Sequence, residues 1–150
     1  MRALIQRVKR ASVTINSEVT GKINNGLLIF LGVGEDDTEK QVQYLVEKCT
    51  GLRIFTDEQD KMNLSVKDIN GEILIVSQFT LFGDCKKGKR PSFVRAARPE
   101  TAIPLYESFI AHCKNTGLNV QTGEFGADMQ IELINDGPVT IWLDTEEMGK

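Results

Sequence analysis

The sequence predicts an α+β domain in which a curved or barrel-like sheet carries two main helices packed on it. Three observations lead to this prediction. Short apolar or alternating runs typical of strands recur along most of the chain, only two stretches have helical spacing, and long strand-rich segments separate those two. With 150 residues and ordinary fractions of apolar and charged residues, the whole chain, 1–150, is expected to form a single domain with its own core.

The first part of the chain is predicted to be a series of strands. Residues 2–8 mix apolar and charged positions, and residues 12–15 alternate between them, so each is expected to form a strand. A turn leads to a further strand at 18–23. Asn24-Asn25-Gly26 signals another turn before the continuously apolar strand 27–31.

Two segments have the spacing of helices. A residue among 36–38 can cap a helix that runs to about Cys49, which is expected to be a buried core residue. A second helix is expected over residues 101–115. His112, the only histidine, lies just off the apolar stripe of this helix, so a surface or half-buried position is favoured over a catalytic role.

The remaining strands follow shorter signals. A short strand is expected at 53–55, a polar loop at 56–70, and a strand at 120–125. Two alternating strands then flank residues 135–138, Asn-Asp-Gly-Pro, which predict a hairpin. Pro138 is unusual there because it removes a donor where the returning strand begins. Either the proline only pre-sets the turn, or the tip is stiff and exposes its carbonyls through a cis bond.

The segment 72–83 combines a buried strand with polar residues. The apolar run 73–76 is typical of a strand buried on both faces, and Ser77, Gln78 and Thr80 follow it directly. If the strand continued, Gln78 and Thr80 would share one face. Because an unpaired buried polar group costs about 1–3 kcal/mol, these groups need partners or water. Two interpretations remain open: the floor of a pocket, or an ordinary strand end that caps a turn.

Charge is unevenly distributed on a chain whose net charge is −3. Residues 86–98 contain no acidic side chain but six basic ones: Lys86, Lys87, Lys89, Arg90, Arg95 and Arg98. A basic segment on an otherwise acidic protein predicts a local anion site, such as one for a nucleic-acid backbone. The alternative is a solvated loop whose lysines serve solubility.

Composition indicates where the protein works and in which state its cysteines are. No apolar run is long enough to span a membrane, and the first residues lack the core of a signal peptide. The three cysteines are odd in number and lack metal-ligand spacing, so reduced thiols are expected, without disulfides or zinc. These features predict a cytoplasmic protein that needs no metal or cofactor and has no membrane partner.

Three segments, taken in order and spacing, closely resemble the D-aminoacyl-tRNA deacylase family. They are residues 77–81 (Ser-Gln-Phe-Thr-Leu), 87–93 (Lys-Gly-Lys-Arg-Pro-Ser-Phe) and 135–140 (Asn-Asp-Gly-Pro-Val-Thr). Arg7-Val8 and residues 123–129 extend the match over essentially the whole chain. Each segment is weak by itself, but together they are specific.

The resemblance implies a proofreading hydrolase that acts on tRNA. Its substrate would be the ester that links a D-amino acid, or glycine mischarged on tRNA(Ala), to the terminal adenosine. It also implies a homodimer in which a Gly-cis-Pro motif, here Gly137-Pro138, reaches into the pocket of the partner subunit and rejects L-aminoacyl-tRNA. The aminoacylated 3′ end of tRNA is the expected partner, and DNA is not.

The catalytic candidates are Ser77, Gln78, Phe79 and Thr80. Thr80 can be a nucleophile only if another group activates it, and the sequence offers no convincing base. We therefore expect the backbone N–H groups of Phe79 and Thr80 to form an oxyanion site. The substrate's own 2′-hydroxyl would carry the protons, the route that the resemblance favours, while Thr80 positions the substrate.

Other residues are assigned to binding and selectivity. Glycine permits close approach and proline fixes the backbone, so Gly137 and Pro138 are candidates for rejecting the wrong hand by a rigid obstacle. Arg7 either holds this loop or is an ordinary surface arginine. The candidates for tRNA binding are Lys86, Lys87, Lys89, Arg90 and Phe93.

Two other classes of function remain open. A non-catalytic module that binds a tRNA end would leave charged aminoacyl-tRNA intact. A small-molecule esterase with Ser77 or Thr80 as nucleophile would hydrolyse simple esters and react with serine-directed reagents.

Overall fold

The computed structural model describes residues 1–150, and a six-stranded mixed sheet forms its centre. Its elements are β1 (Arg2–Ile15), β2 (Glu18–Ile23), β3 (Gly26–Gly32), α1 (Glu39–Gly51), β4 (Phe55–Thr56), β5 (Met62–Leu64), β6 (Glu72–Ser77), the 3-10 turn η1 (Phe79–Phe82), α2 (Pro99–Asn115), β7 (Asn119–Thr122) and β8 (Gln130–Asp144). The strand order is β2-β1-β3-β6-β7, and β8 pairs with β1. β6 is parallel to β3 and β7, whereas β1 is antiparallel to its neighbours.

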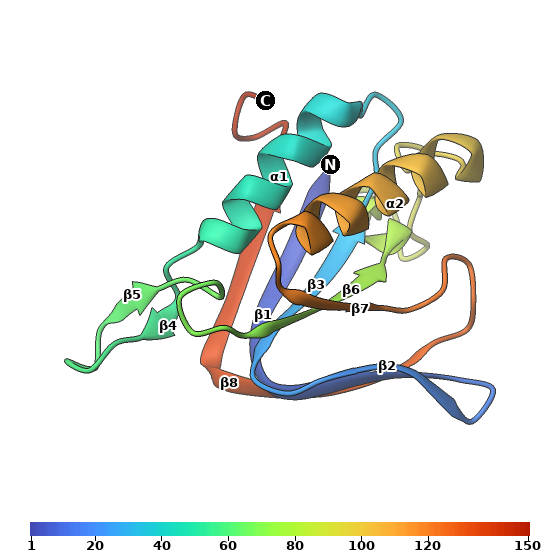
Figure 1. Cartoon of the computed structure of the whole chain (residues 1–150). Helices are drawn as coiled ribbons and strands as arrows, with labels where there is room; N and C mark the ends of the chain where they lie inside the picture. Colours follow the sequence, from blue (N-terminus) through green and yellow to red (C-terminus); the bar gives the residue numbers. More distant parts are fainter.

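The middle strands of the sheet, β3 and β6, are buried on both faces, because helices cover one face and the curled end of the sheet covers the other (Figure 1). Both helices cover one face and pack on residues such as Ile5, Ile29 and Ile75. The distal half of β1 folds back with β2 and covers the other face, where Val13 packs with Leu74. Strands buried on both sides read as continuous apolar runs, as β3 and β6 do. The predicted α+β class, with two helices on a barrel-like sheet, is confirmed.

The helices begin where their capping residues allow. Thr38 is the cap of α1: its backbone N–H donates to Gln41 Oε1 at 2.8 Å, while its side chain accepts from the N–H of Lys40. Cys49 is fully buried, as expected. α2 starts at Pro99, earlier than the predicted position 101, because proline is favoured in the first turn of a helix.

Several predicted strand boundaries were wrong. Residues 2–8 and 12–15 belong to one strand, β1, because the chain bends without leaving the ladder. The strand predicted at 120–125 is the shorter β7. The strand predicted at 53–55 is the two-residue β4, and the polar segment 56–70 contains its partner β5.

The predicted hairpin at residues 135–138 was also wrong. β8 is one strand that pairs with β1 on both sides of this segment, with Thr140 opposite Gln6 and Asn135 opposite Val8. Residues 136–139 therefore leave the ladder as a loop opposite Arg7. The reason is the length of β1, which offers partners to both halves of β8 and removes the need for a reversal.

Neither helix combines the length and the apolar character needed to cross a membrane.

Candidate active site

The chain turns sharply at the end of β6. The strand ends at Ser77, and the N–H of Gln78 donates to Leu31 O at 2.8 Å. The first bond of the turn η1 runs from Leu81 N to Gln78 O at 3.3 Å, so the amides of Phe79 and Thr80 precede it and have no partner within the turn. The strand does not continue through Thr80, and the alternating faces considered for a continued strand do not arise.

The first two side chains of the turn, Phe79 and Thr80, are exposed and face no base. Phe79 is 55% exposed and packs edge-on against Phe93, with ring centroids 5.1 Å apart. The hydroxyl oxygen of Thr80 accepts a hydrogen bond from Nε2, the side-chain amide nitrogen of Gln78. An amide cannot take a proton from a hydroxyl, so Thr80 is not activated as a nucleophile here.

His112 lies away from the turn η1, at the contact between α1 and α2, and is half-buried, as expected from its position off the apolar stripe. Its Nε2 lies 2.7 Å from Oε1 of Glu39, whose carboxylate also accepts from the hydroxyl of Ser108. Hydrogen bonds from Ser108 and His112 lower the pKa of Glu39. This cluster joins α1 to α2, and its serine contacts the carboxylate rather than the histidine, so it has no nucleophile–base arrangement.

A small cavity of about 10 Å³ opens beside the turn. Nine residues line it: Leu31, Val33, Ser77, Gln78, Phe79, Ala97, Ala102, Tyr106 and Phe125. The hydroxyl of Tyr106 donates to Ile75 O at 3.2 Å, and burial raises its pKa to about 12. The volume suits about one water molecule and no amino-acid side chain.

Six wall residues were not among the predicted site residues: Leu31, Val33, Ala97, Ala102, Tyr106 and Phe125. Ala102 and Tyr106 have the helical spacing of core residues, and their contact with Ser77–Phe79 depends on tertiary packing. A buried tyrosine, whose hydroxyl needs a partner, is the one signal that could have pointed to Tyr106.

Arg7, a residue of the sheet strand β1, holds the Gly137-Pro138 loop. The Arg7 side chain is only 10% exposed. Its Nε donates to Asp136 O at 3.0 Å, and its Nη1 donates to Ile54 O at 2.6 Å. The interpretation of Arg7 as an ordinary surface arginine was therefore wrong, and its contacts are those of a residue that holds the loop.

The loop also has its own internal support. Asn135 Nδ2 donates to Arg7 O at 3.0 Å and to Val139 O at 3.1 Å, which closes the loop at its base. The Gly137-Pro138 bond is cis, as predicted. Gly137 has φ +126°, and a Cβ there would collide with the Arg7 guanidinium, so this position requires glycine.

The turn η1 and this loop are attached to different points of β1, its first residue and its middle. The carbonyl of Leu81 in the turn accepts from Arg2, whereas that of Asp136 accepts from Arg7. Five residues of strand separate the two arginine Cα atoms by about 17 Å, and an odd separation places their side chains on opposite faces. The loop is thus built at a distance from the turn of its own chain.

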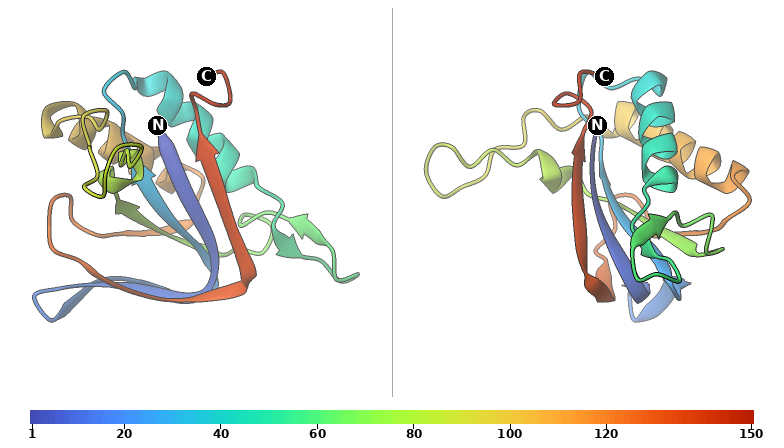
Figure 2. Two further views of the ribbon diagram at one scale, coloured as in Figure 1. Left: turned by 180° about the vertical axis from the view of Figure 1, so that it is seen from behind. Right: turned by 90° about the vertical axis from the view of Figure 1, so that its left-hand side faces the viewer.

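The basic segment projects from the body as a loop (Figure 2, right). Reciprocal backbone bonds between Asp84 and Ser92, of 2.8 and 2.9 Å, close its base. Lys86, Lys87, Lys89 and Arg90 are all exposed, and none of them forms an ion pair within the chain. Together with Asp84 and Ser92, three of them line a hollow of about 330 Å³, open to an anion.

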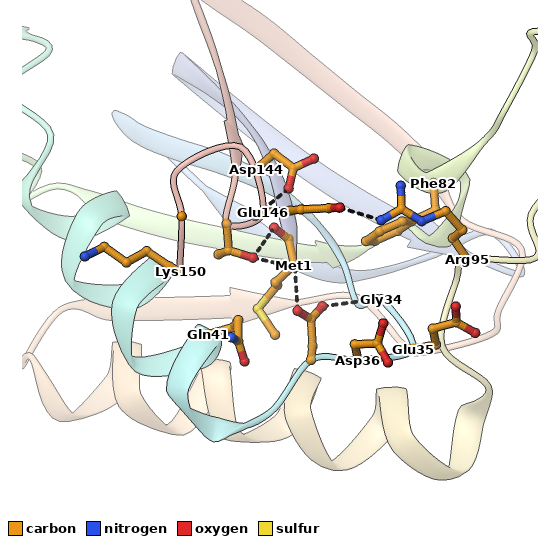
Figure 3. Close-up of a pocket in the computed structure, with 13 residues that line it drawn as sticks. Met1, Gly34, Glu35, Asp36, Gln41, Phe82, Arg95, Asp144, Glu146 and Lys150 are labelled. Atoms are coloured by element: carbon orange, nitrogen blue, oxygen red, sulfur yellow. Dashed lines mark hydrogen bonds and ion pairs between the residues drawn. The ribbon is translucent and has the colours of Figure 1, made fainter.

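A deeper cavity of about 270 Å³ lies between the two chain ends (Figure 3). Two of its positive groups are already paired: the Met1 ammonium with Asp37 at 2.6 Å, and Arg95 with Glu146. Five carboxylate side chains line it, at Glu35, Asp36, Asp37, Asp144 and Glu146, so it repels phosphate. No three acidic, histidine or cysteine side chains of the chain are grouped as metal ligands.

Comparison with known sequences identifies close relatives. The family profile described as D-Tyr-tRNA(Tyr) deacylase matches residues 4–144. The D-aminoacyl-tRNA deacylase of Thermosipho africanus is 60% identical over 148 residues, covering 99% of each chain. The protein of the same name from Clostridioides difficile is 56% identical over 147 residues, covering 98% of this chain and 99% of its own.

Two solved structures share the fold. One, named c-Myc DNA Unwinding Element Binding Protein, has a TM-score of 0.90 at 43% identity and covers 96% of this chain and 98% of its own. The other, a probable eukaryotic D-amino acid tRNA deacylase, has a TM-score of 0.82 and covers 95% of this chain and 97% of its own. Its 18% identity supports the fold alone.

Proposed function

This chain belongs to the D-aminoacyl-tRNA deacylase family, and from this premise we propose how its residues perform and restrict the hydrolysis of D-aminoacyl-tRNA. The enzyme cleaves the ester between the amino acid and the terminal ribose of tRNA. Three features carry the account: the turn η1, the Gly137-Pro138 loop and the basic loop. We place the reaction in the cytoplasm, where tRNA is charged.

The turn supplies the electrostatic part of catalysis. A water oxygen attacks the ester carbonyl, and negative charge develops on the carbonyl oxygen. The N–H groups of Phe79 and Thr80 precede the first bond of the turn and donate to this oxygen. Ser77, Gln78 and the Thr80 hydroxyl line the position of the substrate without bonding covalently to it.

Protons move through the RNA. The 2′-hydroxyl beside the ester takes a proton from the attacking water and passes one to the leaving 3′ oxygen, so the products are free amino acid and intact tRNA. The single observation that carries this assignment is the environment of Thr80, whose hydroxyl meets only the amide of Gln78. No protein group there can act as a base near neutral pH.

Chiral selection works by exclusion. The cavity beside the turn holds about one water molecule, so it cannot recognise the side chain of any amino acid. Gly137-Pro138 instead blocks the side of the Cα atom on which an L side chain would lie. Glycine has no side chain to exclude, so glycyl-tRNA, including glycine mischarged on tRNA(Ala), is also a substrate.

The loop that performs this exclusion comes from a second copy of the chain. Within one chain, Arg2 at the start of β1 and Arg7 near its middle attach the turn and the loop to opposite faces of the strand. β8 has a free edge, and Ile134 and Trp142 are exposed on it. Long unpaired edges are normally covered. A two-fold dimer covers this edge and inserts each loop into the partner's site.

The basic loop binds the RNA backbone. Lys86, Lys87, Lys89 and Arg90 have no ion-pair partners, so phosphates can replace their counterions. Phe93 supports the exposed ring of Phe79, which presents an apolar face near the terminal base. These contacts carry no base sequence information, so several tRNAs are accepted.

Release of amino acid from a matched pair of D- and L-aminoacyl-tRNAs tests this function. We expect hydrolysis of the D form, survival of the L form, and no turnover of either 2′-deoxy substrate. Binding without hydrolysis would identify a tRNA-end-binding module, and hydrolysis of simple esters would identify an esterase that uses Ser77 or Thr80. Duplex DNA serves as a competitor, because one structural relative is named for a DNA element.

A further inference from the structure

Arg2, the first residue of β1, joins the catalytic turn to the end of β8. Its Nε donates to Asp144 Oδ2 at 2.8 Å, and its Nη1 donates to Leu81 O at 2.9 Å. The Arg2 side chain is 18% exposed, and that of Asp144 is 3% exposed. One guanidinium thus contacts a buried carboxylate and a carbonyl of the turn at the same time.

Two aromatic rings fix the plane of this guanidinium. Its central carbon lies 4.5 Å from the ring centroid of Phe82 and 5.6 Å from that of Trp142. Asp144 is held in turn, because its Oδ1 accepts from the N–H of Glu146 at 2.9 Å. The bond to Leu81 therefore comes from a rigid donor, whose planar fork is already ordered.

The turn needs such an external support. η1 has four residues, and short 3-10 turns have poor hydrogen-bond geometry. Phe79 and Thr80 are exposed, and the ring contact of Phe79 is with Phe93 rather than with the buried core, so the core does not hold them. The carbonyl of Leu81 has no amide partner further along the chain, since the N–H of Asp84 donates to Ser92. Arg2 supplies the missing donor.

We propose that Arg2 is a positioning residue for deacylation, which orients η1 so that the amides of Phe79 and Thr80 point at the ester carbonyl. This inference rests on the proposed function of the turn. Arg2 acts through two residues of the turn, Leu81 and Phe82, and does not touch the substrate. A displacement of about 1 Å at a catalytic group can cost about 100-fold in rate, so a support of this kind affects turnover more than binding.

The test compares Arg2→Gln with Arg10→Gln, a matched change of an exposed arginine on the same strand, both in the full-length protein. For D-aminoacyl-tRNA, we expect Arg2→Gln to lower kcat by about 10- to 100-fold with KM changed less than about threefold. Arg2→Lys keeps the charge but reaches only one of the two acceptors, so it should recover part of kcat. Arg10→Gln should match the wild type.

Amide NMR separates positioning from general stability. In Arg2→Gln, the ¹H–¹⁵N signals of Phe79 and Thr80 should shift or broaden at a temperature well below unfolding, while those of α1 stay in place. If Arg2→Gln does not fold, Arg2→Lys serves for the same comparison, with an expected loss of about tenfold in kcat.

Three outcomes would overturn the inference: an unchanged kcat in the folded variant, a loss confined to KM, or unmoved signals of Phe79 and Thr80. Each of these requires a wild type that releases D-amino acid. A wild type that fails to do so would contradict the proposed function instead, so the two failures are distinguishable.

Discussion

The turn η1 and the Gly137-Pro138 loop are each held by an arginine of β1, but the proposed function gives them opposite tasks. Arg2 supports the turn through one carbonyl and leaves the amides of the turn free. Arg7 binds the carbonyls of Asp136 and Ile54 and fills the space beside Gly137, so it ties the loop to the body of the chain. In the proposed function, the turn stabilises a transition state and needs free N–H donors, whereas the loop excludes L-aminoacyl groups and needs only a rigid surface.

The largest effect should come from removing the 2′-hydroxyl of the terminal ribose. If the RNA carries the protons, this change should reduce turnover by about 10²- to 10⁴-fold and leave binding nearly intact. Thr80→Ala should stay within about tenfold of the wild type, since its hydroxyl is not activated. Single-turnover hydrolysis of 2′-deoxy and normal D-aminoacyl-tRNA measures both. A covalent aminoacyl-Thr80 species would contradict this assignment.

A looser loop should lose selectivity before it loses catalysis. Arg7→Met leaves the carbonyls of Asp136 and Ile54 without their donor, at a cost of about 1–3 kcal/mol for each one that stays buried. The loosened loop should then admit L-aminoacyl-tRNA, because it no longer forms a rigid obstacle. The ratio of the D to the L hydrolysis rate should fall by about tenfold or more. Lys9→Met is the control, because that lysine is exposed and touches only the Asp136 carboxylate. Unchanged rejection of the L form would remove Arg7 from selectivity.

Neutralising the basic loop should weaken tRNA binding without altering the turn η1 or the Gly137-Pro138 loop. The quadruple variant Lys86→Gln, Lys87→Gln, Lys89→Gln and Arg90→Gln should bind several tRNAs more weakly and flatten the salt dependence of binding by about 3 in the log–log slope. Selectivity for the D form should survive. An unchanged slope would return these residues to a role in solubility.

The smallest effect should lie far from both segments, at the contact between α1 and α2. The pKa of Glu39 is lowered by its hydrogen bonds from Ser108 and His112, so this carboxylate stabilises the folded state above its ordinary value of 4.5. The contribution should be lost as pH falls below that value. Thermal unfolding of Glu39→Gln and the wild type should therefore differ at pH 6 and converge toward pH 3, with unchanged turnover at pH 7.

The sequence pointed to the turn residues, the loop residues and Arg7 as one candidate support of the loop, but it did not reveal what supports the turn. The Ser-Gln-Phe-Thr run and the Gly-Pro pair are local signals that follow from strand ends and turn chemistry. The hairpin prediction at 135–138 failed because local signals cannot show that β1 is long enough to pair with both halves of β8. Arg2 escaped notice for a similar reason: its partners, Leu81 and Asp144, come from distant parts of the chain.

Cooperation between the turn of one subunit and the loop of the other is the central claim, and a mixed dimer tests it most directly. A turn-defective chain, Arg2→Gln, is co-assembled with a loop-defective chain, Gly137→Val. The added β-branched side chain has no room in the loop and should crowd the site that the loop enters, which lowers hydrolysis of every substrate, the D form included. Hydrolysis of D-aminoacyl-tRNA is measured against each homodimer alone. Random assembly should restore roughly a quarter of wild-type activity, because half of the dimers contain one intact turn–loop pair. If both segments act within one chain, mixing will restore nothing beyond the average of the two homodimers.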